Sequence, residues 1–79
     1  MTEFTLKHPI TGDNGREIKT ITVRRPRVKD IEIMEEESTH LKKSIRLLSL
    51  LGEVSPDEVR RLDAADFNHI SDEVVGFLE

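Results

Sequence analysis

The histidine and serine side chains of this chain are its candidates for catalysis or metal binding, and their spacing fits neither role. The three histidines, His8, His40 and His69, are scattered along the sequence. They show none of the H-x-x-x-H or H-E-x-x-H spacings that bring two ligands to one metal. Ser55 lies outside any G-x-S-x-G nucleophile elbow, and the chain has no cysteine. We therefore expect no catalytic residue, no metal ligand and no cofactor, and predict that the protein is not an enzyme.

Two further patterns indicate local structure. Gly12 and Gly15 form a G-x-x-G, which matches neither the Rossmann nor the P-loop fingerprint and predicts a turn. The acidic cluster contains Asp30, Glu32, Glu35, Glu36 and Glu37. It lacks the D-x-[DN]-x-[DN]-G loop whose oxygens converge on calcium. We interpret this cluster as a solvated face of a helix.

The best case for a ligand is a basic run, Arg24-Arg25-Pro26-Arg27-Val28-Lys29, whose four bases could contact phosphates. However, the chain has no Trp or Tyr and three Phe, which leaves little material for stacking on bases. Charge is also divided along the chain. Residues 1–29 carry seven basic and three acidic side chains, and residues 30–79 carry five and thirteen. The alternative is that the arginines pair with the acidic helical half, within one copy or between copies.

Alternation of apolar and polar residues predicts two strands at the start of the chain. Residues 3–10 form the first alternating run, which should end at Pro9 or lie at a sheet edge, because proline cannot donate to a ladder. Turn residues fill 11–16, and a second alternating run rich in β-branched side chains follows over 19–24. These runs predict a β-hairpin over about residues 3–25.

The apolar spacing changes to that of helices after the basic run. A short helix is expected from Val28 to Met34, and the sequence leaves open whether it continues through Ser38 and Thr39. Leucines at helical spacing follow, and Gly52 is the expected C-cap of their helix.

Two start signals then mark the remaining helices. Ser55 and Glu58, with Pro56 between them, form a capping box, and Asp63 is a second N-cap. The predicted fold is α+β: an N-terminal β-hairpin followed by three to four short α-helices in one small domain over residues 1–79. The helical part covers about residues 28–78.

The chain is short, and its core must be small. Seventy-nine residues fit one domain whose net stability is on the order of 3–5 kcal/mol, so a partner or self-association would stabilise it. No apolar run is long enough to cross a bilayer, and the N-terminus lacks the layout of a signal peptide. Four of residues 47–51 are leucines. They form either a fully buried central helix or an exposed patch for a partner helix.

Three motifs carry a resemblance to a known family. They are Arg24-Arg25-Pro26 followed by Asp30, Ser55-Pro56-Asp57-Glu58 leading to Leu62-Asp63-Ala64-Ala65-Asp66-Phe67, and Val74-Val75-Gly76-Phe77-Leu78. In these the chain resembles the tail assembly chaperones of Mu-like and related contractile-tailed phages and prophages. The resemblance spans nearly the whole chain, is most specific in the C-terminal quarter and is loosest over residues 35–46.

The resemblance implies a role in the cytoplasm of the bacterial host and absence from the mature virion. Such chaperones coat the helical tape measure protein, keep it soluble and bring tail tube subunits to it. Many also exist in a longer, frameshifted form with a disordered extension, of which this chain would be the short counterpart.

Our hypothesis is a non-enzymatic chaperone that binds amphipathic helical segments of a tape measure protein through apolar helix surface. The expected apolar contacts are Leu47, Leu50, Leu51, Phe67, Ile70 and Phe77. Electrostatic steering is expected from Arg24, Arg25 and Arg27. The alternatives are a small nucleic-acid-binding regulator that uses the basic run and a minor structural subunit of the tail. Neither nucleic acid nor a membrane is an expected partner.

Overall fold

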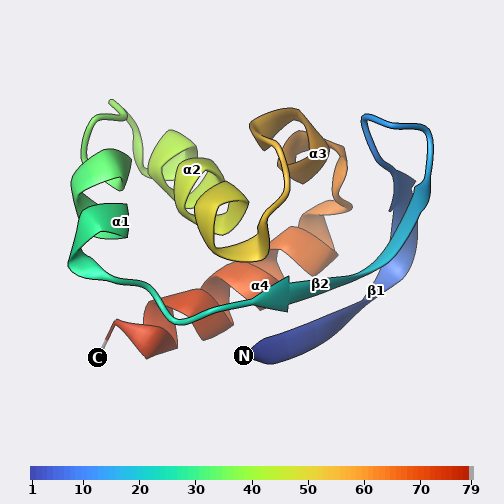
Figure 1. Cartoon of the computed structure of the whole chain (residues 1–79), viewed down its shortest axis with the longest axis horizontal. Helices are drawn as coiled ribbons and strands as arrows, with labels where there is room; N and C mark the ends of the chain where they lie inside the picture. The colour runs from blue at the N-terminus through green and yellow to red at the C-terminus, as the bar shows by residue number, and fades with distance from the viewer. Residues whose placement is uncertain (79) are drawn as a thin grey trace.

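A computed structural model describes residues 1–78 of the chain. A two-stranded hairpin precedes four helices over these residues, which confirms the predicted α+β class. The elements are β1 (Thr2–Thr11), β2 (Glu17–Val23), α1 (Val28–Met34), α2 (His40–Gly52), α3 (Pro56–Arg61) and α4 (Ala64–Phe77). Figure 1 shows α2 between α1 and α3, with α4 running beneath them and the hairpin passing below α2 and rising beside α3. Within this part of the chain, no helix is long and apolar enough to cross a membrane.

The antiparallel hairpin is irregular in the middle of β1. Thr5 pairs with Thr20 and Ile10 pairs with Ile18, so residues 6–9 bulge out of the ladder. Pro9 lies in this bulge. It therefore removes no ladder hydrogen bond, and β1 continues past it to Thr11. Of the two outcomes expected for the proline, a position at a sheet edge is the one observed.

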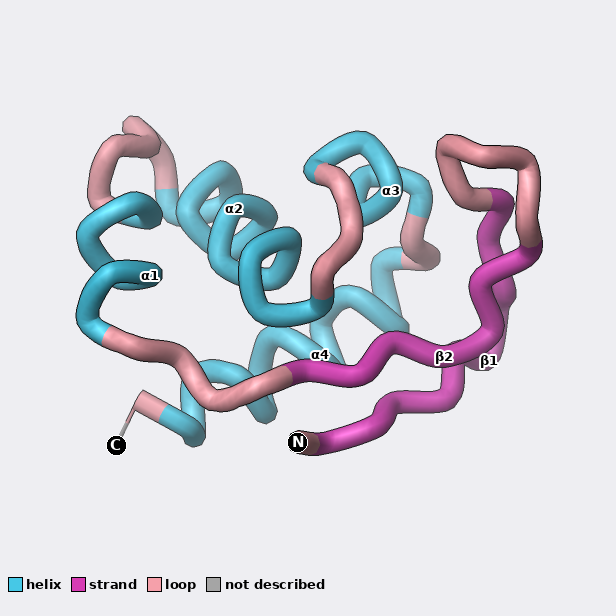
Figure 2. The backbone as a smooth tube through the Cα atoms, in the orientation of Figure 1, coloured by secondary structure: helices cyan, strands magenta, loops and turns pink. Residues whose placement is uncertain are grey.

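The starts of α2, α3 and α4 each follow from a local capping residue. Thr39 accepts a hydrogen bond from the N–H of Lys42 and begins α2, so the helical pattern that was left open at Ser38 and Thr39 is broken there (Figure 2). The predicted capping box of Ser55 and Glu58 is present at α3. Asp63 caps α4 by accepting from the N–H of Ala65.

The expected role of Gly52 was wrong. Gly52 is the last residue of α2, and the left-handed residue that follows the helix is Glu53, with φ of 54°. A Cβ on Gly52 would lie 2.9 Å from Cγ2 of Ile21 on β2. The glycine is needed because the strand passes this close to the helix, and the N–H of Arg24 donates to the carbonyl of Leu51 at the same place.

The core lies between the inner face of the hairpin and helices α2, α3 and α4. Alternate residues of both strands point into it, as the sequence pattern predicted. Its buried apolar residues are Phe4, Leu6, Ile10, Ile21, Val23, Leu47, Leu48, Leu51, Val59, Leu62, Ile70 and Val74.

Candidate partner-binding surface

The six apolar side chains expected to contact a partner divide into two groups. Leu47, Leu51 and Ile70 are buried in the core. Leu50, Phe67 and Phe77 are half-buried. The leucine-rich stretch therefore supplies the central helix of the core. A contact role stays a prediction for the half-buried residues and for Leu47, which also lines a groove described next.

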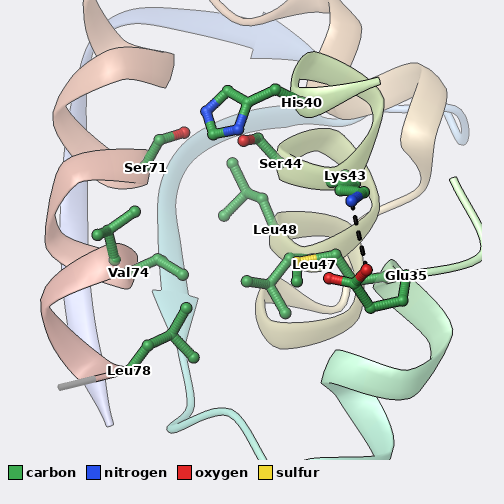
Figure 3. A pocket seen from close by; sticks show the side chains of 11 residues that line it. Glu35, His40, Lys43, Ser44, Leu47, Leu48, Ser71, Val74 and Leu78 are labelled. Atoms are coloured by element: carbon green, nitrogen blue, oxygen red, sulfur yellow. Dashed lines mark hydrogen bonds and ion pairs between the residues drawn. The ribbon is translucent and has the colours of Figure 1, made fainter. Parts of the chain in front are cut away.

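The first apolar groove, which we call the α1-side groove, encloses about 260 Å³. It lies between α2 and the C-terminal half of α4, with the end of α1 closing one side (Figure 3). Val74 and Val75 of α4, with Leu78 just after it, face Leu47 and Leu48 of α2 across it.

Polar side chains of the α1-side groove lie at its rim and at one end. Lys43 Nζ lies 3.3 Å from Glu35 Oε2, and this pair bridges α2 and α1. At the other end, the hydroxyl of Ser71 points toward His40 and Ser44 (Figure 3). Ser71 Oγ is enclosed and has no hydrogen-bond partner within residues 1–78.

The second groove, which we call the α3-side groove, encloses about 370 Å³ on the opposite flank of α2. Leu41 and Ile45 of α2 form one wall, and Ala64 and Phe67 of α4 form another. Arg60 is the charged residue of its lining. Its walls are otherwise apolar, so water gains few hydrogen bonds there and a partner's apolar side chains would displace it favourably.

The first two turns of α2 separate the two grooves. Leu41 and Ile45 are spaced i, i+4 and share one face of the helix, whereas His40 and Ser44 share the next. On α4, Phe67, Ser71 and the residues beyond them continue one stripe from the α3-side groove into the α1-side groove. The two grooves are therefore neighbouring parts of one surface built on α2 and α4.

Three exposed apolar residues in these grooves were absent from the sequence-based contact list. Leu41 is 59% exposed, Val75 53% and Leu78 43%. Leu41 and Leu78 have the helical spacing that is typical of core residues, so the pattern alone favours burial for both. Val75 follows the buried Val74 and lies at the edge of the apolar stripe of α4. No local signal distinguishes the three, because their exposure depends on which other elements of the fold cover them.

The arginines expected to steer a partner have different roles. The guanidinium of Arg24 donates two hydrogen bonds, each of 2.8 Å, to the two carboxylate oxygens of Asp30. Arg25 donates a long hydrogen bond to the carbonyl of Phe77, and Arg27 is exposed. Arg24 therefore ties the end of β2 to α1, while Arg25 and Arg27 keep steering as their predicted role.

The interpretation of Asp30 as part of a solvated face was wrong. Asp30 is 0% exposed, and its carboxylate also accepts a hydrogen bond from the backbone N–H of Arg27 at 2.8 Å. The hydrogen bonds from Arg24 outweigh the opposing effect of burial, and with the Arg27 N–H they lower the pKa of Asp30 to about 2. Four of the five acidic residues of the cluster are not buried, whereas Asp30 is the partner of the basic run.

Residues of the C-terminal sequence motifs join the helices to the hairpin. Asp66 accepts hydrogen bonds from the N–H groups of Lys7 and His8 in the bulge of β1, at 3.1 and 3.0 Å. Burial raises the pKa of Asp66, but these two donors outweigh it and the pKa lies below its ordinary value. Glu58 accepts from the N–H of Asp13 in the hairpin loop. These motif residues therefore hold the fold together and leave the grooves to apolar side chains.

The described residues contain no group of three His, Asp or Glu side chains that could hold a metal ion. The histidines lie on separate elements. His69 packs its ring edge-on against Phe4 of the core, with ring centroids 5.8 Å apart. The surface that the structure assembles is thus apolar with charged flanks, which suits the binding of another polypeptide.

Comparison with known proteins gives one family. Residues 3–79 match the family described as "Phage tail assembly chaperone proteins, E, or 41 or 14". No curated protein and no solved structure matches the chain. The matched region includes the hairpin, the basic run, all four helices and both grooves. The chain therefore belongs to the phage tail assembly chaperone family.

Proposed function

We propose that the protein is a non-enzymatic chaperone that acts in the host cytoplasm by binding amphipathic helical segments of a tape measure protein. In this proposal it keeps that protein soluble, assists assembly of the tail tube around it, and does not remain in the mature virion. The observation that supports the proposal is the pair of apolar grooves beside α2, with Leu41, Val75 and Leu78 exposed along them.

The shape of the surface suits a helix as occupant. An amphipathic helix presents apolar side chains at i, i+3, i+4 and i+7, and such a row lies along a groove between two helices. An unassembled helix with a long apolar stripe aggregates through that stripe. Covering the stripe with the grooves removes the apolar surface of both partners from water.

The test is co-expression with the longest helical tail protein of the same genome, followed by pull-down and a solubility assay. We expect co-purification and a larger soluble fraction of the partner. Leu41→Asp and Val75→Asp should each abolish most of the co-purification, because each places a charge on one groove wall that a partner would cover. Both side chains are more than half exposed, so the variants should still fold.

Val28→Asp is the matched control, because Val28 is 81% exposed on α1 and lines neither groove. It should bind like the unchanged protein. Equal binding by all three variants would place the contact outside the grooves. If no tail protein binds, a mobility shift at low salt and a search for the chain in purified particles would test the nucleic-acid and virion-subunit alternatives.

A further inference from the structure

The first turn of α2 lacks the acidic residue that the other three helices carry in their first turn. The third residue of α1, α3 and α4 is acidic, namely Asp30, Glu58 and Asp66. A carboxylate there faces the positive end of the helix dipole and stabilises the helix. The corresponding residue of α2 is Lys42, and its first turn has no acidic residue at all. Such departures from local rules are expected where a surface serves function.

Lys42 lies on the outer side of α2 between the two grooves, a side that it shares with Arg46 and that we call the crest of α2. Successive residues of a helix are about 100° apart, so Lys42 lies between Leu41, which lines the α3-side groove, and Lys43, which lines the α1-side groove. It is exposed, and the half-buried Arg46 follows it one turn later on the same side.

The charges of this crest are not balanced by the protein itself. Lys43 is paired with Glu35, the residue that follows α1. Lys42 and Arg46 have no ion-pair partner among residues 1–78. The sequence of α2 contains three basic side chains and no acidic one, in a chain whose net charge is −4. Positive charge is therefore concentrated between two apolar grooves.

We propose that the occupant of the grooves is an amphipathic helix whose apolar stripe is flanked by Asp and Glu side chains. The apolar stripe fills a groove, and the flanking carboxylates meet Lys42 and Arg46 on the crest of α2. This inference rests on the proposed function and adds to it the charge of the partner. Charge complementarity of this kind speeds association and excludes partners with basic flanks.

The experiment uses two synthetic helical peptides with the same leucine stripe and opposite flanks, one with Glu and one with Lys. A length of about 20 residues gives a helix of about 30 Å, which matches the 30 Å long axis of the molecule. Binding is measured with the full chain by fluorescence anisotropy at low and at physiological salt. We expect the Glu peptide to bind several-fold more tightly than the Lys peptide, with a difference that shrinks as salt rises.

Two charge reversals test the position of the contact. Lys42→Glu should weaken binding of the Glu peptide by roughly threefold or more and leave the fold intact, because Thr39 and Glu at position 42 would form a capping box. Lys19→Glu is the matched control. It makes the same charge change on β2, where Lys19 is exposed beside Glu17 and lines neither groove. It should have little effect.

Each alternative outcome is distinguishable. Equal or preferred binding of the Lys peptide overturns the proposed charge and leaves the chaperone proposal standing. Binding of neither peptide overturns this inference, while the co-expression test judges the chaperone proposal separately. Sedimentation of the chain alone tests a second copy as occupant, and a dimer that the Glu peptide fails to displace would also overturn the inference.

Discussion

At the scale of single residues, the charges of this chain serve structure more than the sequence indicated. Arg24 donates two hydrogen bonds to the carboxylate of Asp30 and so joins the end of β2 to α1. Asp66 accepts two backbone N–H groups that the bulge of β1 leaves without strand partners. In both cases a carboxylate is buried because donors surround it, and removal of the charge would leave those donors unsatisfied.

Asp30→Asn is expected to lower the free energy of unfolding by about 2 kcal/mol at pH 7, because it removes a buried charge-assisted pair. Urea denaturation followed by circular dichroism measures this change. Glu32→Gln, on the same helix but exposed, should change stability by less than about 0.5 kcal/mol. A similar loss in both variants would assign the effect to the charge of α1 as a whole.

The same pair predicts a pH dependence. The pKa of Asp30 is lowered from 3.8 to about 2, so its contribution is fully present above the unfolded value and is lost as pH falls through the folded value. The stability gap between the unchanged protein and Asp30→Asn should therefore stay constant at neutral pH and narrow from about pH 4 to about pH 2. A gap that persists unchanged to pH 2 would contradict the assignment.

At the scale of elements, the close approach of β2 to α2 determines what the end of α2 tolerates. Gly52 has Ile21 Cγ2 at 2.9 Å from the position of a Cβ, whereas Gly76 in α4 has nothing within 4 Å. The two glycines have the same intrinsic cost in a helix. Their surroundings differ, and the surroundings decide whether replacement by alanine raises or lowers the stability of the protein.

Gly52→Ala should destabilise the protein by about 1–3 kcal/mol, because the new methyl group forces strand and helix apart. Gly76→Ala should leave stability unchanged or raise it by up to about 1 kcal/mol, through helix propensity. Urea denaturation of the two variants side by side measures the difference. A stabilised Gly52→Ala variant would show that β2 can shift away from α2 without cost.

At the scale of the whole molecule, a small core is combined with two open apolar grooves. Twelve apolar residues of the described part of the chain form the core, and α2 and α4 contribute residues both to it and to the grooves. A domain of 79 residues has only about 3–5 kcal/mol of net stability. A partner that fills the grooves would therefore add a stabilisation that is large compared with the net stability of the free domain.

The melting temperature should rise when a tape measure segment is bound. At a free concentration 100-fold above Kd the gain is about 2.7 kcal/mol, which corresponds to an increase of about 10–20 °C for a domain of this size. Differential scanning calorimetry of the chain with and without the segment measures it. Leu41→Asp should show a much smaller rise, and an equal rise in that variant would contradict binding at the grooves.

Local structure could be predicted well from the sequence because its causes are local. Alternation predicted the two strands. Ser55 and Glu58, which are only three positions apart, predicted the start of α3. The family motifs could also be identified from the sequence, because Glu58 and Asp66, which join the helices to the hairpin, lie in one short stretch of the chain. Gly52 was misassigned because its reason is Ile21, a residue 31 positions away on another element.

The sequence by itself determined the fold class, the order of elements and most helix ends, because backbone hydrogen bonds and side-chain periodicity act over a few residues. Only the tertiary structure decided that Asp30 and Asp66 are buried, since Asp66 meets Lys7 across 59 positions of the chain. It also decided which apolar side chains stay exposed. Leu41 and Leu48 belong to one helical stripe, yet Leu41 is 59% exposed in the α3-side groove and Leu48 is 1% exposed, because the neighbouring elements cover one and leave the other open.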